Sequence, residues 1–439
     1  MKRSTTIGSF MFLAAMVVAA LATISNGKPA AAAADPALVG ADIAWMLTAT
    51  ALVLLMTPGL AFFYGGMVRK KNVISTMLQS AASMGVISIL WLIAGFSLAF
   101  GDSIGGIIGN PMTFLFFNGV GTAPNAAFAA TIPLALFALF QLKFAIITPA
   151  LITGSFAERI KFSSYVIFMV LFSLLIYAPV AHWTWHPNGF LRQWGVLDFA
   201  GGAVVHMTSG FAALAGALAI GRRIHVVGGG HQPANIPFVV LGTGLLWFGW
   251  FGFNAGSALT AGGPAVTAFL TTNMASAAAM IGWLLLEIAN GRKPTAQGGC
   301  TGAVVGLVAV TPAAGFINVG SSVLIGLIAA AISYMAVQWK NQSKVDDALD
   351  VFPCHGVGGA VGMIATAIFA GEGGLIYGSP KLLLVHLGAL VIVAAYSFGV
   401  SFFLFKLVDK LMFLRVDAHE ERHGLDLSQH GETIEPAAS

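Results

Sequence analysis

The sequence predicts an all-α membrane protein with eleven transmembrane helices. Spans 1–5 and 6–10 are expected to form an inverted repeat, followed by a long eleventh helix. Of the 439 residues, 57% are hydrophobic and only 9% are charged, whereas soluble domains contain about 25% charged residues. Apolar stretches of about 20 residues, the length that spans a bilayer, recur along the chain. Short motifs also recur in the same order in its two halves.

Residues 1–34 have the pattern of a secretory signal peptide. Lys2 and Arg3 form a charged start, residues 7–24 an apolar core, and residues 25–34 a stretch rich in small residues where cleavage is expected. The alternative is an uncleaved first span. The alanine-rich segment before Asp35 favours cleavage.

Residues 35–414 are expected to form one membrane domain, and residues 415–439 a polar tail that is either disordered or folded against the membrane domain. The eighth apolar stretch is short and rich in glycine, so its ends are weakly defined. The predicted spans are 41–65, 73–100, 131–154, 161–185, 198–221, 235–258, 264–290, 299–313, 317–339, 351–370 and 382–413.

Loop charge supports this arrangement. Alternate loops contain only Arg192 and Lys381, whereas the other set is basic. The positive-inside rule therefore places the mature N-terminus outside and the C-terminus in the cytoplasm, in a multi-pass protein of the bacterial inner membrane. The basic loop residues are Arg69, Lys70, Lys71, Arg159, Lys161, Arg222, Arg223, Arg292, Lys293, Lys340 and Lys344.

The internal repeat is recognised from paired motifs. An aspartate precedes a histidine by eight residues twice, and two further motifs recur in the same order. Each half has five spans, an odd number, so the second half is inverted, as in many transporters whose site lies at the repeat interface. The pairs are Asp198–His206 with Asp347–His355, Thr148-Pro149-Ala150 with Thr311-Pro312-Ala313, and Phe63–Gly66 with Phe253–Gly256.

His206 and His355 are the strongest candidate functional residues. Ionisable groups inside a bilayer are costly and usually face a pore or a partner. Histidine can both donate and accept a proton near neutral pH. We interpret the pair as lining a narrow path for a small, hydrogen-bonding, protonatable solute. The alternatives are two packed histidines bonded to backbone carbonyls, or a metal pair, which no neighbouring ligand at suitable spacing supports.

Aromatic and acidic residues form a second candidate group. Phe140 and Phe144 share one helical face, and Trp183 and Trp185 close span 4. Such rings are either interfacial anchors or the walls of a cation cage. Span 6 ends with rings, glycines and polar residues between 250 and 257, a pattern that suggests a ring stack beside the Ser257 hydroxyl.

Other classes of protein have little support. For Asp198 we favour the role of a helix N-cap. The alternative is electrostatic support for a cation site. The predicted spans contain no GxSxG, no HExxH and no paired catalytic aspartates, and the two cysteines form no CxxC pattern, so we expect no enzyme activity, no cofactor and no bound metal. The pI of about 9.1 reflects loop topology rather than nucleic-acid binding.

The same residues resemble the bacterial ammonium transporter (Amt) family over essentially the whole mature chain. The matching segments are Met56–Leu60, Phe63–Gly66, Phe140–Thr148, Ala157–Arg159, Ala181–Trp185, Asp198–His206, Gly252–Ser257, Asp350–Val357, Gly424–Asp426 and His430–Glu432. The paired histidines and the Phe-Asn-Ala-Gly-Ser motif are the most specific of these.

The resemblance implies a role for each candidate. Trp185, Phe140 and Ser257 match an outer ammonium-recruitment site that Asp198 supports. Phe144 and Phe253 match the stacked pair that closes the pore, and His206 and His355 match the pair that lines it. It also implies a homotrimer with one pore per subunit, and a tail that helps dock trimeric PII-type regulatory proteins.

The implied function is transport of ammonium, deprotonated at the aromatic site, through a narrow apolar pore. Alternatives are a Rhesus-type ammonia or carbon dioxide channel and an ammonium sensor without flux. Trp185 and Ser257 favour the Amt branch over the Rhesus branch. Two departures stand out: one extra residue in the loop after Trp185, and Lys143 where a neutral residue is expected.

Overall fold

The computed structural model describes residues 13–23, 37–224 and 232–434. Most of the expected signal peptide, residues 1–12 and 24–34, lies outside these ranges, as does the end of the tail, 435–439. The described part of the signal segment, Leu13–Thr23, is a short apolar helix.

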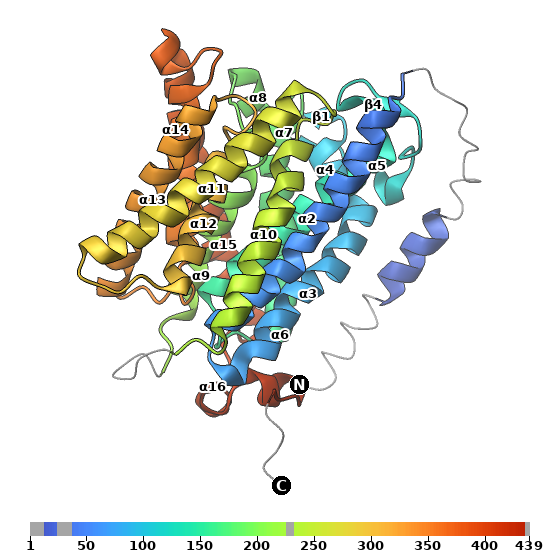
Figure 1. Ribbon diagram of the computed structural model, residues 1–439. Helices are drawn as coiled ribbons and strands as arrows, with labels where there is room; N and C mark the ends of the chain where they lie inside the picture. The colour runs from blue at the N-terminus through green and yellow to red at the C-terminus, as the bar shows by residue number, and fades with distance from the viewer. Residues whose placement is uncertain (1–12, 24–36, 225–231, 435–439) are drawn as a thin grey trace.

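The membrane domain is a bundle of long helices, as predicted (Figure 1). Within the described residues, ten helical segments are long and apolar enough to cross a membrane. The shorter apolar helix α12, Ala296–Val310, corresponds to the predicted eighth span and completes eleven. The long helices are α2 (Gly40–Met67), α3 (Val73–Leu90), α5 (Leu134–Ile152), α6 (Phe162–Phe172), α9 (Thr208–Ile220), α10 (Ile236–Gly256), α11 (Gly263–Ala289), α13 (Val319–Gln342), α14 (Gly358–Phe369) and α15 (Lys381–Met412).

Several spans are built from consecutive helical segments joined by π-helical turns. A π turn inserts one extra residue into a helix and is frequent at functional sites. Two of these turns, η6 and η7, open the helices α9 and α14. The π-helical turns are η2 (Trp91–Gly95), η5 (Ser173–Tyr177), η6 (Gly202–Met207) and η7 (Phe352–Val357). The other continuing segments are the 3-10 turns η1 (Lys70–Asn72) and η4 (Thr153–Ser155) and the α-helices α4 (Phe96–Phe100) and α7 (Ala178–Trp185).

Two small hairpins follow α4, a feature that the sequence did not lead us to expect. They cover one end of the bundle, which we call the hairpin end (Figure 1). Short helices lie in the loops at both ends of the bundle. The elements are β1 (Ser103–Ile104), β2 (Ile108–Gly109), η3 (Leu115–Phe117), β3 (Pro124–Asn125), β4 (Ala129–Pro133), α8 (Phe190–Trp194), η8 (Leu375–Tyr377), α16 (Ala418–His423) and η9 (Asp426–His430).

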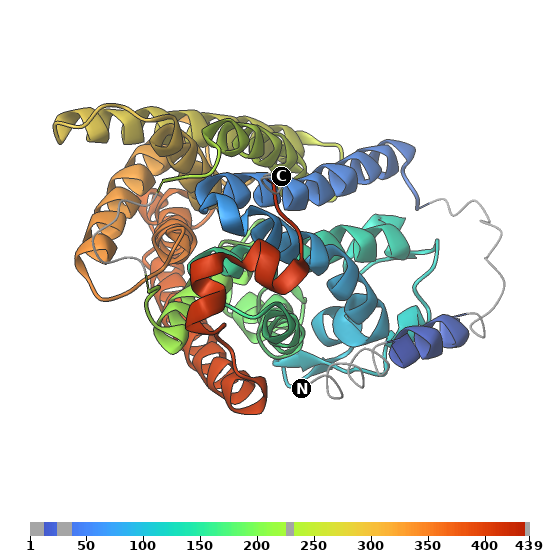
Figure 2. The same cartoon turned by 90° about the horizontal axis from the view of Figure 1, so that it is seen from below.

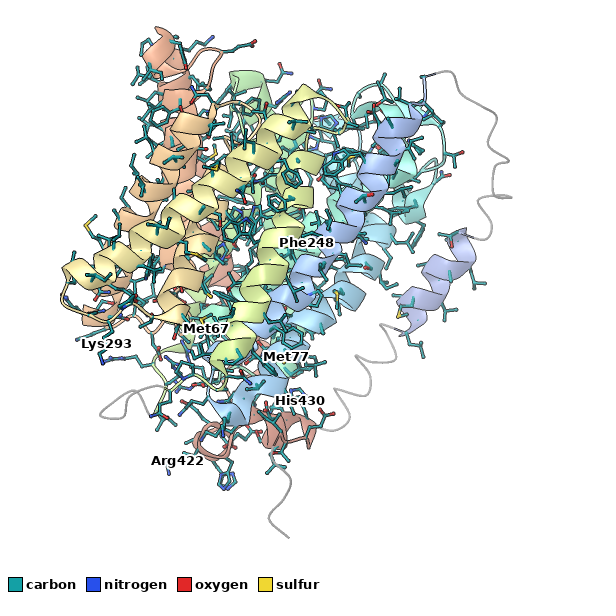
Figure 3. The ribbon with its side chains drawn as sticks, in the orientation of Figure 1. Met67, Met77, Phe248, Lys293, Arg422 and His430 are labelled. Atoms are coloured by element: carbon teal, nitrogen blue, oxygen red, sulfur yellow. The ribbon has the colours of Figure 1, made fainter. Side chains whose placement is uncertain are left out.

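The opposite end of the bundle, which we call the tail end, is covered by α16 and η9. Figure 2 shows these elements lying across it, and in Figure 3 Lys293, Arg422 and His430 gather there. The Asp426 carboxylate accepts the backbone N–H groups of Ile74 and Ser75 at 3.1 and 2.7 Å. It thereby caps the first turn of α3, whose orphan N–H groups need acceptors. The described tail is therefore folded against the domain.

The inverted repeat is visible in how the two halves pack. Helix α9 contacts η7, and α14 contacts η6, so each half places its opening π turn against the helix of the other. The first helices of the two halves, α2 and α10, also pack together. Small residues permit this closeness, because membrane helices approach best where side chains are short.

Candidate functional site

His206 and His355 meet at the centre of the bundle. Their Nδ1 atoms lie 3.2 Å apart, and both residues are buried. An Nδ1–Nδ1 hydrogen bond requires one ring to donate and the other to accept. The two imidazoles therefore hold opposite tautomers, so one Nε2 atom is a donor and the other is an acceptor. The His206 Nε2 atom has no hydrogen-bond partner within the described part of the chain.

Glycines bring the two imidazoles together. A Cβ atom placed on Gly210, one turn after His206, would lie 2.0 Å from the backbone nitrogen of Gly356. A Cβ atom on Gly359 would approach the His206 Cβ atom to 3.1 Å. The backbones of α9 and η7 thus touch directly, and only glycine permits that contact.

Two aspartates anchor the π turns that carry the histidines. The Asp198 carboxylate accepts four backbone N–H groups at 2.7–3.3 Å, from residues 201 to 204. Asp347 accepts the N–H of Phe352 at 2.7 Å. Because carboxylates satisfy the orphan donors of a helix start, these contacts give Asp198 the capping role as well as a place near the solute path.

A cavity of about 950 Å³ opens at the hairpin end. We call it the vestibule. Trp185, Asp198 and Ser257 line it, and Phe144 forms its floor toward the histidines. The Trp185 indole N–H donates to the Asp198 backbone carbonyl at 3.0 Å, which fixes the ring. The Ser257 hydroxyl donates to the Phe253 carbonyl at 2.9 Å and so keeps its oxygen lone pairs available to a cation.

Phe144 and Phe253 separate the vestibule from the histidines. Their ring centroids lie 4.3 Å apart, and Phe144 also meets Trp185 edge-on at 5.8 Å. Beyond them lies a small cavity of about 10 Å³, lined by Phe253, His206 and His355. This volume is about that of one water-sized probe. The pair therefore closes the path to anything larger than a small molecule.

A third cavity of about 50 Å³ continues to the tail end. We call it the tail-end cavity. His355 lines both this cavity and the small one, as do Phe63 and Val304. Met67, another lining residue, lies toward the tail end in Figure 3. Asp198 borders the vestibule and Asp350 borders the tail-end cavity, so the two histidine-bearing helices start from opposite ends of the bundle. This is the inverted arrangement expected from the sequence.

Phe140 and Trp183, two of the candidate residues, do not line the vestibule. Phe140 is fully buried, packs edge-on against Phe144 at 4.9 Å and is not among the residues that line the vestibule. Trp183 is also buried, and its indole donates to the Ile107 carbonyl at 2.7 Å. It supports the first hairpin instead of lining the path. The role predicted for Phe140 stays a prediction.

Gln141 is a vestibule residue for which the sequence suggested no role. It lines the cavity beside Phe144, and its Oε1 atom has no hydrogen-bond partner in the described residues. The sequence could have indicated this residue, because Gln141 is a polar side chain within an apolar span and follows Phe140. Among the described residues, no group of three or more histidine, cysteine or acidic side chains is placed to hold a metal ion.

The fold and this line of cavities define a polytopic membrane protein with a narrow path between its two ends. The sequence model of the Ammonium Transporter Family matches residues 44–435, and the chain belongs to that family. It is 49% identical to a putative ammonium transporter of Methanothermobacter thermautotrophicus over 402 residues, covering 89% of this chain and 97% of that one. An ammonium transporter of Bacillus subtilis is 45% identical, with 89% and 97% covered.

A solved structure gives the same picture. The crystal structure of Saccharomyces cerevisiae Mep2 superposes with a TM-score of 0.83 at 34% identity, covering 88% of this chain and 89% of that one. The family is one of transporters, and this chain accordingly is an ammonium transporter by membership.

Proposed function

We propose that the chain takes up ammonium at the vestibule, removes a proton there, and passes ammonia between the two histidines to the tail-end cavity. One observation carries this proposal: three cavities follow one another through the bundle, and imidazoles lie in the narrow one. The Phe144–Phe253 ring pair separates the vestibule from the small cavity, which shares Phe63, Val304 and His355 with the tail-end cavity. On this basis we assign recruitment to Trp185, Ser257, Asp198 and Phe140, closure to Phe144 and Phe253, and solute hydrogen bonding to His206 and His355.

Desolvation explains why the proton must leave. An ion that enters a dry, apolar passage loses hydration at a cost of several kcal/mol or more. Potassium cannot shed its charge, but ammonium becomes neutral by giving up a proton. The vestibule can hold the cation beforehand, because an aromatic face attracts a cation by about 0.5–2 kcal/mol and the Ser257 oxygen can accept a hydrogen bond. Selectivity then follows from acidity as well as size.

The imidazole pair suits ammonia better than it suits a cation. Ammonia both donates and accepts hydrogen bonds, and opposite tautomers of the pair offer one donor and one acceptor Nε2 atom. The His206 ring stacks on aromatic neighbours, with centroids 5.4 Å from Trp250 and 5.9 Å from Phe253, and on His355 at 5.3 Å. Among the described residues that line the small cavity, none has a carboxylate that could serve a cation as counter-ion.

The test of this proposal is transport by the purified protein in proteoliposomes. Addition of ammonium should produce a current or an internal pH change that empty vesicles do not show, and potassium at the same concentration should produce neither. Equal responses to the two ions would exclude a path that depends on deprotonation.

Replacing Trp185 with leucine should change the half-saturating ammonium concentration several-fold, because the cation loses an aromatic contact of about 0.5–2 kcal/mol. Trp185→Phe, which keeps an aromatic face, should lie between wild type and leucine. Trp194→Leu is the matched control, since Trp194 is at the same end of the bundle, half exposed and outside the vestibule lining. Ammonium-dependent currents measure all three. Equal shifts for Trp185→Leu and Trp194→Leu would contradict a recruiting role.

We also propose the topology and assembly that the family resemblance implies. Residues 1–34 act as a cleaved signal peptide, the hairpin end faces outward, and the tail end faces the cytoplasm of a bacterial cell. The chain forms a homotrimer. The tail end then offers a basic, folded surface on which a trimeric PII-type protein can dock, with matching symmetry.

Deleting the residues after Leu414 should weaken binding of a PII-type protein, because the deletion removes α16 and η9 from the docking surface. It also removes the Asp426 cap of α3 and the Glu421 carboxylate, which accepts the Ile224 N–H at 2.6 Å. Deleting only 435–439 is the control. Pull-downs with the cognate PII-type protein, with and without ATP and 2-oxoglutarate, measure the effect. Undiminished binding by the longer deletion in every condition would show that the tail has no docking role.

A further inference from the structure

A lysine ammonium group is paired with an acidic residue that lines the tail-end cavity. Lys340, in the last turn of α13, places its Nζ atom 2.7 Å from the Asp350 carboxylate. The same atom donates to the Asp347 backbone carbonyl at 3.0 Å. The Lys340 side chain is only 10% exposed. A primary ammonium group is thus held by a carboxylate and a carbonyl at the end of a path for ammonium.

Asp350 is the residue that makes this a cation site. It lines the tail-end cavity together with His355, and no other acidic or basic residue is in that lining as described. Its backbone is left-handed, with φ of 59°, a conformation that is uncommon for a residue other than glycine.

The loop that carries Asp350 is held on both sides. Ala348 and Leu349 donate their N–H groups to the carbonyls of Ser155 and Gly154, both at 3.1 Å. The Asp350 carbonyl accepts the N–H of Cys354 at 3.0 Å, which joins it to η7. The carboxylate therefore stays at the cavity edge whether or not a cation is present.

We propose that Lys340 is a tethered ammonium ion that fills a cation site beside the tail-end cavity and prevents Asp350 from retaining ammonium there. This inference rests on the proposed function for its consequence in transport, but the site itself is defined by Lys340 and Asp350. Without Lys340, the Asp350 carboxylate, whose side chain is 29% exposed, would lose its ion-pair partner and would attract a free cation from the cavity. The Lys340 side chain supplies that partner without blocking the path with a diffusible ion.

Chemical rescue tests the site directly. Lys340→Ala removes the ammonium group and most of its stem, so an added propylammonium ion should take its place. Propylammonium should raise the apparent unfolding temperature of the variant saturably by a few degrees, as a ligand of the native state does. Wild type should not respond. The neutral 1-propanol, of similar size, should not rescue, and the double variant Lys340→Ala/Asp350→Asn should lose the response.

The outcomes decide the proposal in either case. If Lys340→Ala purifies only in buffer that contains propylammonium, that requirement is itself the rescue. Equal stabilisation of wild type and variant, rescue by 1-propanol, or rescue that survives Asp350→Asn would overturn the site. Ammonium-dependent currents should be smaller in vesicles with the variant than with wild type, because the Asp350 carboxylate then retains ammonium. Rescue without any ammonium transport by wild type would refute the proposed function and leave the cation site standing.

Discussion

Replacing His206 or His355 with alanine is expected to change ammonium permeation roughly 5- to 150-fold. A hydrogen-bonding group left unpartnered in a dry environment loses about 1–3 kcal/mol, and each substitution removes one of the two imidazoles that meet at 3.2 Å. Ammonia in the passage would then lose a donor or an acceptor. The space vacated by the ring would also admit water, so rejection of potassium should weaken.

Ammonium and potassium currents in proteoliposomes, with size-exclusion profiles of each variant, measure both effects. His386→Gln is a matched control for the narrow part of the path, because His386 is also buried but lines none of the three cavities. It bonds the Met363 carbonyl and the N–H of Leu197, a vestibule residue. Unchanged ammonium permeation and unchanged potassium rejection in both alanine variants would show that the imidazoles are packing residues.

The long-range arrangement of the spans was predictable because membrane proteins obey simple rules. Length and hydropathy located α5, α10 and α11 to within a few residues, since a spanning helix must be long and apolar. The eighth span was correctly expected to be short, and α12 has only 15 residues. The repeated Asp–His spacing put the two histidines at equivalent positions of an inverted repeat, and the structure places them in contact.

The loops were less predictable, because their structure depends on partners distant in sequence. The hairpins between α4 and α5 follow no strong local signal, and β3 and β4 contain an irregularity in register. The capping of α3 by Asp426 joins residues about 350 positions apart. The sequence near Val73 does not predict this cap.

The candidate site was partly readable in the same way. Chemistry identified the histidines, because imidazoles in an apolar span are unusual. The sequence does not show how far along the path a residue lies. Phe140 and Phe144 share one helical face and therefore seemed equivalent, but of the two only Phe144 lines the vestibule. The Lys340–Asp350 ion pair was not predicted, because ten residues separate the two side chains and each charge lies near the end of a span, where charges are common.

Replacing Glu158 with glutamine is expected to destabilise the protein by roughly 3 kcal/mol near neutral pH. The Glu158 side chain is fully buried at the tail end, where it forms ion pairs with Arg69 at 2.7 Å and Arg223 at 3.2 Å. Burial opposes its ionisation, but the hydrogen bond from Arg69 and the charges of Arg223 and Arg69 outweigh burial and lower the pKa of Glu158 from 4.5 to about 2. Each unit of pKa corresponds to about 1.4 kcal/mol.

The same pKa shift sets a pH window. A carboxyl group whose pKa is lowered in the folded state contributes stability that is fully present above its unfolded pKa and is lost as pH falls through its folded pKa. The contribution of Glu158 should therefore be constant above pH 4.5 and disappear between pH 4.5 and about pH 2. Asp346, whose pKa Arg223 also lowers to about 2 against the effect of burial, should add to the loss in that window.

Intrinsic fluorescence of the detergent-solubilised protein during heating measures both expectations. The Glu158→Gln variant should unfold at a lower temperature than wild type at pH 7, and the difference should shrink as the pH approaches 2. Glu287→Gln is the control, because Glu287 is a buried carboxylate that accepts only neutral donors, the N–H and hydroxyl of Thr295 at 2.8 and 2.9 Å. Breaking a buried ion pair strands the remaining charges, whereas an amide can replace a carboxylate that has neutral partners. If the two variants lost equally in unfolding temperature at pH 7, the ion pairs of Glu158 with its arginines would contribute no more than ordinary buried hydrogen bonds. The tail-end ion pairs would then have no special part in holding α2, α6 and α9 together.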